Sequence, residues 1–219
     1  MSDELELAPA AGFVETELRS EFPHLRLDWV TVRAGVRPSP PAVRERLRRL
    51  SDRYRGANVV AMRTQPIPHA YRTFFHHIGL DPDSDRVPSE KAAVMRLLHG
   101  EFRSRDVVRD ALLIALVETG VPVWALDAAL VDAAGLGIRT SVAGERLGTG
   151  EHAGALLAGR LVVADAQAVH ALLFGDVAPG HEVTGRTQRM ALFSVGVEGV
   201  PAIHVEEAMW ICLEILTTR

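Results

Sequence analysis

The stretch Ser104–Asp127, S-R-D-V-V-R-D-A-L-L-I-A-L-V-E-T-G-V-P-V-W-A-L-D, constrains the fold more than any other part of the chain. Asp106 is placed to cap a helix by accepting a hydrogen bond from a free backbone N–H group. Gly120 is typical of the left-handed residue that ends a helix, and the proline two positions later prevents the helix from continuing. Because Ala111–Val117 is apolar on every side, we expect a helix with no solvent-facing side. The sequence therefore predicts a central buried helix followed by a rigid segment, Val121–Asp127, where a pocket would form.

The part of the chain before this stretch is predicted to be mainly helical. Residues 1–23 are interpreted as a loose lead-in that includes a short helix at Glu15–Ser20. Ser39 is expected to cap a helix that starts with two prolines and ends near Tyr54. The other elements expected in this part are a strand at Leu25–Val32 and helices at Pro66–Ile78 and Ser89–Gly100.

After the central helix, the composition favours short strands. The glycines between residues 135 and 159 are interpreted as β-turns, because none is followed by the Lys-Ser or Lys-Thr of a phosphate-binding loop. A helix at His204–Thr217 is expected to close the chain. The predicted strands are Leu136–Ser141, Leu161–Ala164, Ala168–Phe174 and Arg189–Val197. This order is typical of an α+β fold, and we expect a mainly antiparallel β region packed on the central helix in one domain over residues 1–219.

The overall charge does not favour nucleic acid as a partner. The formal net charge is −4 and the pI is about 6.1, so attraction to RNA must come from a local patch. The most basic predicted element is the helix after Ser39, in which Arg44 and Arg48 share one face. Two interpretations of this face stay open: a solvated surface, or a contact with RNA phosphates.

Several other classes of protein are not indicated. The only cysteine, Cys212, excludes an internal disulfide and fits a reducing compartment. Neither a secretion signal nor an unbroken membrane-spanning run is recognised, so we expect a cytoplasmic protein. His76 and His77 would point about 100° apart on a helix, and no paired metal-ligand spacing occurs, so neither a metal nor a cofactor is expected. No motif for a nucleophile and its base stands out.

A series of short segments nevertheless forms a recognisable pattern. Its parts, in order along the chain, are the helix and glycine-proline segment Val108–Asp127, Arg139 followed by Gly144-Glu145, the strand Leu161–Ala164 with Asp165, and the turn Glu182–Thr187 leading into Met190–Phe193. With this order and spacing, residues 105–195 resemble the B3/B4 domain of the phenylalanyl-tRNA synthetase β chain, a tRNA-binding and editing domain. Residues 24–100 look like the helical leader of free-standing members, and Tyr71–Gly79 is similar to their first helix.

The resemblance implies a B3/B4-type α+β fold that handles the 3′ end of charged tRNA. In synthetases this domain hydrolyses a wrongly attached amino acid, so it implies an aminoacyl-tRNA deacylase acting in trans. The implied partners are tRNA and an amino acid or aminoacyl group; neither DNA nor a membrane is expected. Arg44 and Arg48 are the candidate RNA contacts. By matching positions, the candidate substrate-binding residues are Trp124, Asp127, Arg139, Thr187 and Phe193.

Three positions depart from the family pattern. Trp124 stands where the family has a pocket histidine, Phe193 where it has a glutamate that reads the tyrosine hydroxyl, and Leu112 where it has a threonine. None of these side chains can hydrogen-bond a phenol as the family residues would, so editing specific for tyrosine is not expected. Two alternatives to a hydrolase therefore stay open: a non-catalytic module that binds tRNA or an amino acid, and a protein-interaction module that retains only the fold.

Overall fold

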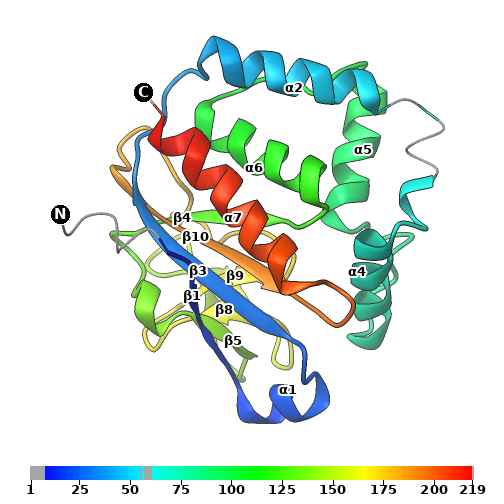
Figure 1. Ribbon diagram of the computed structural model, residues 1–219. Helices are drawn as coiled ribbons and strands as arrows, with labels where there is room; N and C mark the ends of the chain where they lie inside the picture. The colour runs from blue at the N-terminus through cyan, green and yellow to red at the C-terminus, as the bar shows by residue number, and fades with distance from the viewer. Residues whose placement is uncertain (1–7, 55, 57–60, 219) are drawn as a thin grey trace. The chain divides into compact units, whose positions relative to one another are not determined.

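The computed structural model describes residues 8–54, 56 and 61–218 of the 219-residue chain (Figure 1). These residues have an α+β fold, with six α-helices and two sheets among the described elements, which confirms the predicted fold class. The backbone divides into two compact units. The sheet unit comprises the described residues up to Val36 together with Trp124–Val195, and the helical unit comprises those of 37–123 and 196–218. The expectation of a single domain stays a prediction.

The sheet unit contains two sheets. The first has the strand order β1 (Ala10–Ala11), β3 (Arg26–Arg33), β10 (Arg189–Gly196) and β4 (Val123–Asp127). The second has the order β2 (Phe13–Val14), β5 (Gly137–Thr140), β8 (Leu161–Ala164), β9 (Val169–Leu172), β6 (Arg146–Leu147) and β7 (Gly154–Ala155). In this second sheet β5, β8 and β9 pair in antiparallel fashion, whereas β2 and β6 each pair in parallel with a neighbour. The four longer strands predicted after the central helix are confirmed within about two residues at each end.

The N-terminal segment passes from one sheet to the other at Gly12. Its N–H donates to the carbonyl of Leu27, and the next N–H, of Phe13, donates to the carbonyl of Leu136. A Cβ atom on Gly12 would lie 2.5 Å from the Leu136 carbonyl oxygen and 2.6 Å from Leu27 Cδ2, so only glycine fits there. The part of the chain expected to be a loose lead-in therefore carries β1, β2 and the helix α1 (Thr16–Glu21).

The helical unit is built around α6 (Val107–Thr119), which contacts three other helices of this unit (Figure 1). These are α2 (Pro41–Arg53), α5 (Pro88–His99) and the closing helix α7 (Ala202–Thr217); α4 (Pro66–His77) completes the unit. Asp106 caps α6 as predicted, because its carboxylate accepts the N–H groups of Val108 and Arg109. Gly120 ends the helix with a φ of 77°, which also confirms the prediction.

Two details of the helical unit differ from the sequence predictions. Leu112, Leu113 and Leu116 are only partly buried, so α6 does have an accessible side, although it is apolar. Ser39 does not cap α2: Pro40 occupies the cap position, and the Ser39 hydroxyl donates to Oδ2 of Asp110 at 2.6 Å instead. The buried carboxylate is the stronger acceptor, and this explains why the serine turns away from the start of α2.

Two residues of the closing helix α7, Cys212 and Trp210, differ in burial. Cys212 is fully buried in α7 and packs as an apolar residue, as predicted. Trp210, on the same helix, is 49% exposed. Among the described residues, no helix is both long enough and apolar enough to cross a membrane.

Candidate functional site

Two of the predicted substrate-binding residues, Trp124 and Phe193, stack on each other in the sheet unit. Their ring centroids lie 5.3 Å apart and their planes differ by 9°. Phe174 adds an edge-on contact to Trp124, with a centroid distance of 5.8 Å. Phe193 is only 1% exposed, whereas Trp124 is partly exposed. Trp124 is therefore the member of this aromatic cluster that a ligand can reach without displacing core atoms.

Asp127 and Thr187 are also brought together, by a hydrogen bond of 2.6 Å from the Thr187 hydroxyl to Oδ2 of Asp127. The Thr187 hydroxyl oxygen accepts the N–H of Thr184, and Oδ1 of Asp127 accepts the N–H of Ala129. Both side chains thus fix local turns, and their hydrogen-bonding capacity is largely used within the protein. Their contact with a substrate stays a prediction.

The predicted residue Arg139, in β5, is paired with Glu145. Nη1 of Arg139 donates to Oε2 of Glu145 at 2.9 Å, and the second guanidinium nitrogen donates to Oε1. The hydrogen bond from Arg139 holds the pKa of Glu145 below its ordinary value, against the opposing effect of burial. Glu145 also accepts the N–H of Val142. Arg139 therefore closes the turn between β5 and β6 and is not a free cation.

The predicted RNA contacts on α2 differ in availability. Arg44 and Arg48 are both exposed. The guanidinium of Arg48 donates to both carboxylate oxygens of Glu45, at 2.9 and 2.7 Å, whereas no ion pair of Arg44 is found within the described part of the chain. An anion would have to compete with Glu45 for Arg48, so Arg44 is the more available of the two.

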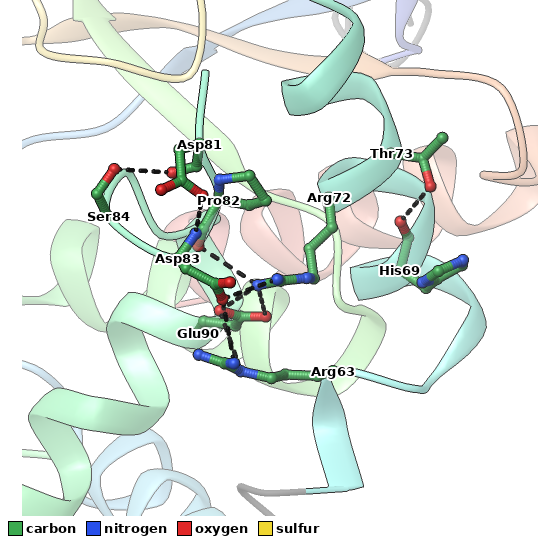
Figure 2. A network of polar contacts seen from close by, with 9 residues as sticks. All are labelled: Arg63, His69, Arg72, Thr73, Asp81, Pro82, Asp83, Ser84 and Glu90. Carbon is green, nitrogen blue, oxygen red and sulfur yellow. Dashed lines mark hydrogen bonds and ion pairs between the residues drawn. The ribbon is translucent and has the colours of Figure 1, made fainter. Parts of the chain in front are cut away.

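The loop of three aspartates before α5 is held by an ion-pair network (Figure 2). Arg72 of α4 donates to Glu90 at 3.0 Å and to Asp83 at 2.9 Å, and Arg63 lies 3.1 Å from Asp83. Asp81 accepts the N–H of Asp83, which tightens the turn. These contacts give the carboxylates a structural role. Across residues 8–54, 56 and 61–218, no group of three potential ligands is arranged to hold a metal ion.

A groove in the helical unit was not predicted from the sequence. It lies between α5, the connection that follows it and α6, and its volume is about 570 Å³. Its apolar lining includes Ala92 and Met95 of α5 and Leu112 and Leu113 of α6. Leu112, at the position where the resemblance would place a threonine, thus belongs to the wall of this groove. The prediction that this helix has no accessible side was wrong, because its partly buried residues Leu112 and Leu113 form part of the groove wall.

Arginines surround this groove. Arg103, Arg105 and Arg109 are exposed, and Arg109 is paired with Asp106 at 2.9 Å. No ion pair of the Arg103 or Arg105 side chain is found among the described residues. Within the described residues, the groove therefore offers two guanidinium groups without an ion-pair partner beside an apolar wall. The sequence signal for it was the local alternation of arginine in residues 103–109, which lies mostly between two helices and so escapes a search for basic helix faces.

The groove also contains acidic groups. Asp110 is buried and accepts hydrogen bonds from the hydroxyls of Ser39 and Ser104, at 2.6 and 2.5 Å, and from the N–H of Arg105 at 2.9 Å. Its oxygens face protein donors, and they hold the segment that carries Arg103 and Arg105 against α6. The exposed Glu101 is the other carboxylate of the groove.

Comparison with known proteins adds no family to this description. No protein-family model matches the chain, and no curated protein matches it. The class that the fold defines is thus an α+β protein with a sheet unit and a helical unit.

Proposed function

We propose that the chain is a free-standing, cytoplasmic tRNA-binding domain of the B3/B4 editing type. It binds the single-stranded 3′ end of charged tRNA and hydrolyses the ester bond of a misattached amino acid other than tyrosine. The observation that carries the proposal is the groove of the helical unit, with an apolar wall and the side chains of Arg103 and Arg105, which have no ion pair among the described residues. The resemblance of residues 105–195 to that family supports the choice of tRNA as the anion.

The groove has one of the two properties that single-strand binding sites combine. Such sites pair cations along the phosphates with aromatic side chains on which bases stack; here the cations are present beside an apolar wall, and Phe102, an aromatic residue of the groove, is buried. Its volume of about 570 Å³ lies in the range of small-molecule sites, which suits one nucleotide. Because the chain carries a net charge of −4, this local concentration of arginine is the source of attraction to RNA.

The sheet unit supports a specificity other than tyrosine. A site built to recognise a phenol needs a buried hydrogen-bonding group, which then rejects substrates that lack the hydroxyl. Trp124 and Phe193 provide stacked rings at the corresponding positions, and neither offers a carboxylate or an imidazole. An aminoacyl group sensed here would be selected by shape and apolar contact at Trp124.

The experiment is a binding and deacylation assay with a panel of mischarged tRNAs. We expect tRNA binding that weakens with salt, and faster ester loss for at least one non-tyrosyl member of the panel than in buffer. Binding that does not change with salt would contradict the RNA-binding part of the proposal. Salt-dependent binding without loss of any ester would leave a non-catalytic tRNA-binding module and contradict the hydrolase.

The second candidate is a protein-interaction module that retains only the fold. The observation that favours it is a group of three exposed apolar side chains near the end of α5, where Met95 is 46%, Leu97 44% and Leu98 74% exposed. Such residues gathered on one helix are typical of a surface that binds another protein. The same binding assay separates the two functions, because this candidate predicts no affinity for tRNA at any salt concentration.

A further inference from the structure

Four polar side chains of the sheet unit form a continuous chain from the core to the surface. Nε2 of His170, in β9, lies 2.8 Å from Oδ2 of Asp165, which directly follows β8. Nδ1 of His170 lies 2.8 Å from Nδ1 of His181, and Nε2 of His181 lies 3.2 Å from Oγ1 of Thr149. Asp165, His170 and His181 are buried, whereas Thr149 is exposed.

Asp165 is held as an ionised carboxylate. Oδ1 accepts the N–H groups of Gln167 and Ala168, at 2.8 and 2.9 Å, and Oδ2 accepts the N–H of Asp132 at 2.9 Å. Burial acts to raise the pKa of Asp165, but these hydrogen bonds and His170 together hold it below its ordinary value. Nε2 of His170 lies 2.8 Å from Oδ2 of Asp165 without the alignment of a hydrogen bond. Because a lone pair on Nε2 would repel the ionised carboxylate at this distance, we place a proton on Nε2 of His170.

The remaining protons depend on whether Nδ1 of His170 also carries one. Where it carries none, it can only accept, and His181 donates to it from its own Nδ1. Nε2 of His181 is then the free base position, and it faces the hydroxyl of Thr149. A hydroxyl beside an imidazole that can accept its proton, with a further group that orients the imidazole, is the arrangement of an activated nucleophile.

The loop around Thr149 is anchored on one side and open on the other. Thr149 lies between two glycines with left-handed backbone, Gly148 at a φ of 88° and Gly150 at 71°. A Cβ atom on Gly148 would lie 3.1 Å from Cβ of Ala178, whereas a Cβ atom on Gly150 would meet nothing within 4 Å. Within the described residues, the N–H of Gly150 has no hydrogen-bond partner. Gly150, directly after Thr149, thus offers a donor to an oxygen that develops negative charge beside Thr149.

We propose that Thr149 is the nucleophile of an acyl-transfer site, with His181 as its general base and His170 and Asp165 as positioning residues, and that the site acts on carboxylic esters with an accessible acyl group. Burial, and next the neighbouring His170, lower the pKa of His181, while Glu182 and Asp165 oppose this effect. His181 is therefore neutral, and able to accept a proton, at neutral pH.

The reaction proceeds in two balanced halves. Oγ1 of Thr149 attacks the ester carbonyl carbon while its proton moves to Nε2 of His181, and the carbonyl electron pair moves to the oxygen. Collapse of this intermediate breaks the bond to the leaving alkoxide, which takes the proton from His181. Water then attacks the acyl-threonine and gives its proton to His181, which returns it to Thr149 as the acid leaves. The net change is ester plus water to acid plus alcohol.

This inference goes beyond the proposed function, since it concerns residues of the sheet unit alone and needs no RNA. The test is hydrolysis of p-nitrophenyl acetate by the intact chain, combined with mass spectrometry of the acetylated protein. The chain suits this probe, because it has one lysine, Lys91, and one cysteine, Cys212, which is fully buried. Competing acylation of amine and thiol side chains is thus limited to Lys91.

We expect an acetyl group on the peptide that contains Thr149. Thr149→Ala should lower the rate at least about 100-fold, as expected when a nucleophile and its general base no longer act together, while Thr149→Ser keeps the hydroxyl and retains activity. The matched control is Thr73→Ala, which removes an exposed hydroxyl bonded to a helix carbonyl in α4, and it should leave the rate unchanged. Because Thr149 is exposed, both of its variants should fold.

The positioning role of His170 is tested by the pH profile. His170 lowers the pKa of His181, so in His170→Asn the midpoint of the rate profile should move to higher pH and the rate should fall. The proposal would be overturned if Thr149→Ala hydrolysed the ester as fast as the wild-type chain. It would also be overturned if acetyl groups were found on Lys91 or on histidines and none on Thr149. Either result would show that His181, His170 and Asp165 only anchor the loop that carries Thr149.

Discussion

The indole of Trp124 is stacked on the ring of Phe193, with centroids 5.3 Å apart and planes within 9°. The two residues lie in β4 and β10 of the first sheet, and the resemblance to the B3/B4 family matched both with polar pocket residues. Here the pair fills that position with apolar atoms, and the deeper ring of Phe193 belongs to the core. The stack is thus a source of stability whether or not a ligand contacts Trp124.

The first prediction concerns this stack. Trp124→Ala removes the contacts with both Phe193 and Phe174, so we expect a loss of about 3 kcal/mol in the free energy of unfolding, measured by urea titration. Trp210→Ala is the control, because that side chain is half-exposed, and its cost should be below about 1 kcal/mol. Equal losses in the two variants would show that the stack contributes little.

The sequence was informative about elements and less so about what their side chains do. The two ends of α6 could be predicted from Asp106 and Gly120, because capping depends on residues within one turn of the helix. The accessible side of α6 could not be predicted, since it depends on where α5 and the following connection lie. The same holds for Ser39, whose hydroxyl is drawn to a carboxylate 71 positions away in the sequence.

Some of the predicted site residues lie together in the structure, and others are occupied elsewhere. Trp124 with Phe193, and Asp127 with Thr187, are pairs distant in sequence that the structure brings together. The contacts that occupy Arg139 could not be inferred without knowing the turn that Glu145 closes. The connected side chains of Thr149, His181, His170 and Asp165 were missed, because a motif search relies on fixed spacing. These residues come from different segments of the sheet unit.

The second prediction concerns the ion-pair network of Figure 2. The side chain of Glu90 is 6% exposed and that of Arg72 15%, so Arg72→Ala leaves a nearly buried carboxylate with Arg63 at 3.8 Å as its remaining cation. We expect a loss of about 3 kcal/mol in the free energy of unfolding. Asp83→Asn, in the solvent-exposed part of the same network, should shift the urea midpoint much less. A larger effect of Asp83→Asn would contradict this assignment.

The third prediction is a pH dependence of stability that comes from His181. Its pKa is lowered in the folded protein, first by burial and then by His170, from the ordinary value of 6.5. The unfolded chain therefore takes up the proton first as the pH falls. The contribution of His181 is fully present above about pH 6.5 and declines below it until the pKa of the folded state is reached.

We expect the urea midpoint to fall between pH 7.5 and pH 5.5, and His181→Asn to reduce this fall. His24→Gln, at an exposed position of the sheet unit, is the control and should retain the pH dependence of the unchanged chain. A midpoint in His181→Asn that falls as steeply as in the control would assign the pH dependence to other groups.

The last prediction ranks the two basic surfaces of the helical unit as RNA-binding surfaces. Removing one cation that binds a phosphate should reduce the slope of log affinity against log salt by about 0.7 for a single strand. Replacing Arg103 and Arg105 together by alanine should therefore reduce the slope by about 1.4, because neither side chain is paired within the described part of the protein. The measurement is fluorescence anisotropy of labelled tRNA at several salt concentrations.

Replacing Arg44 and Arg48 together removes the same charge from α2 but should change the slope by about 0.7 at most, because Glu45 already holds Arg48. Arg160→Ala with Arg186→Ala, at exposed positions of the sheet unit, controls for the change in net charge alone. If the α2 variant shows the larger change, the RNA follows the helix predicted from the sequence and not the groove. If all three double variants change the slope equally, the attraction is a property of the net charge, and the groove has no special role in binding RNA.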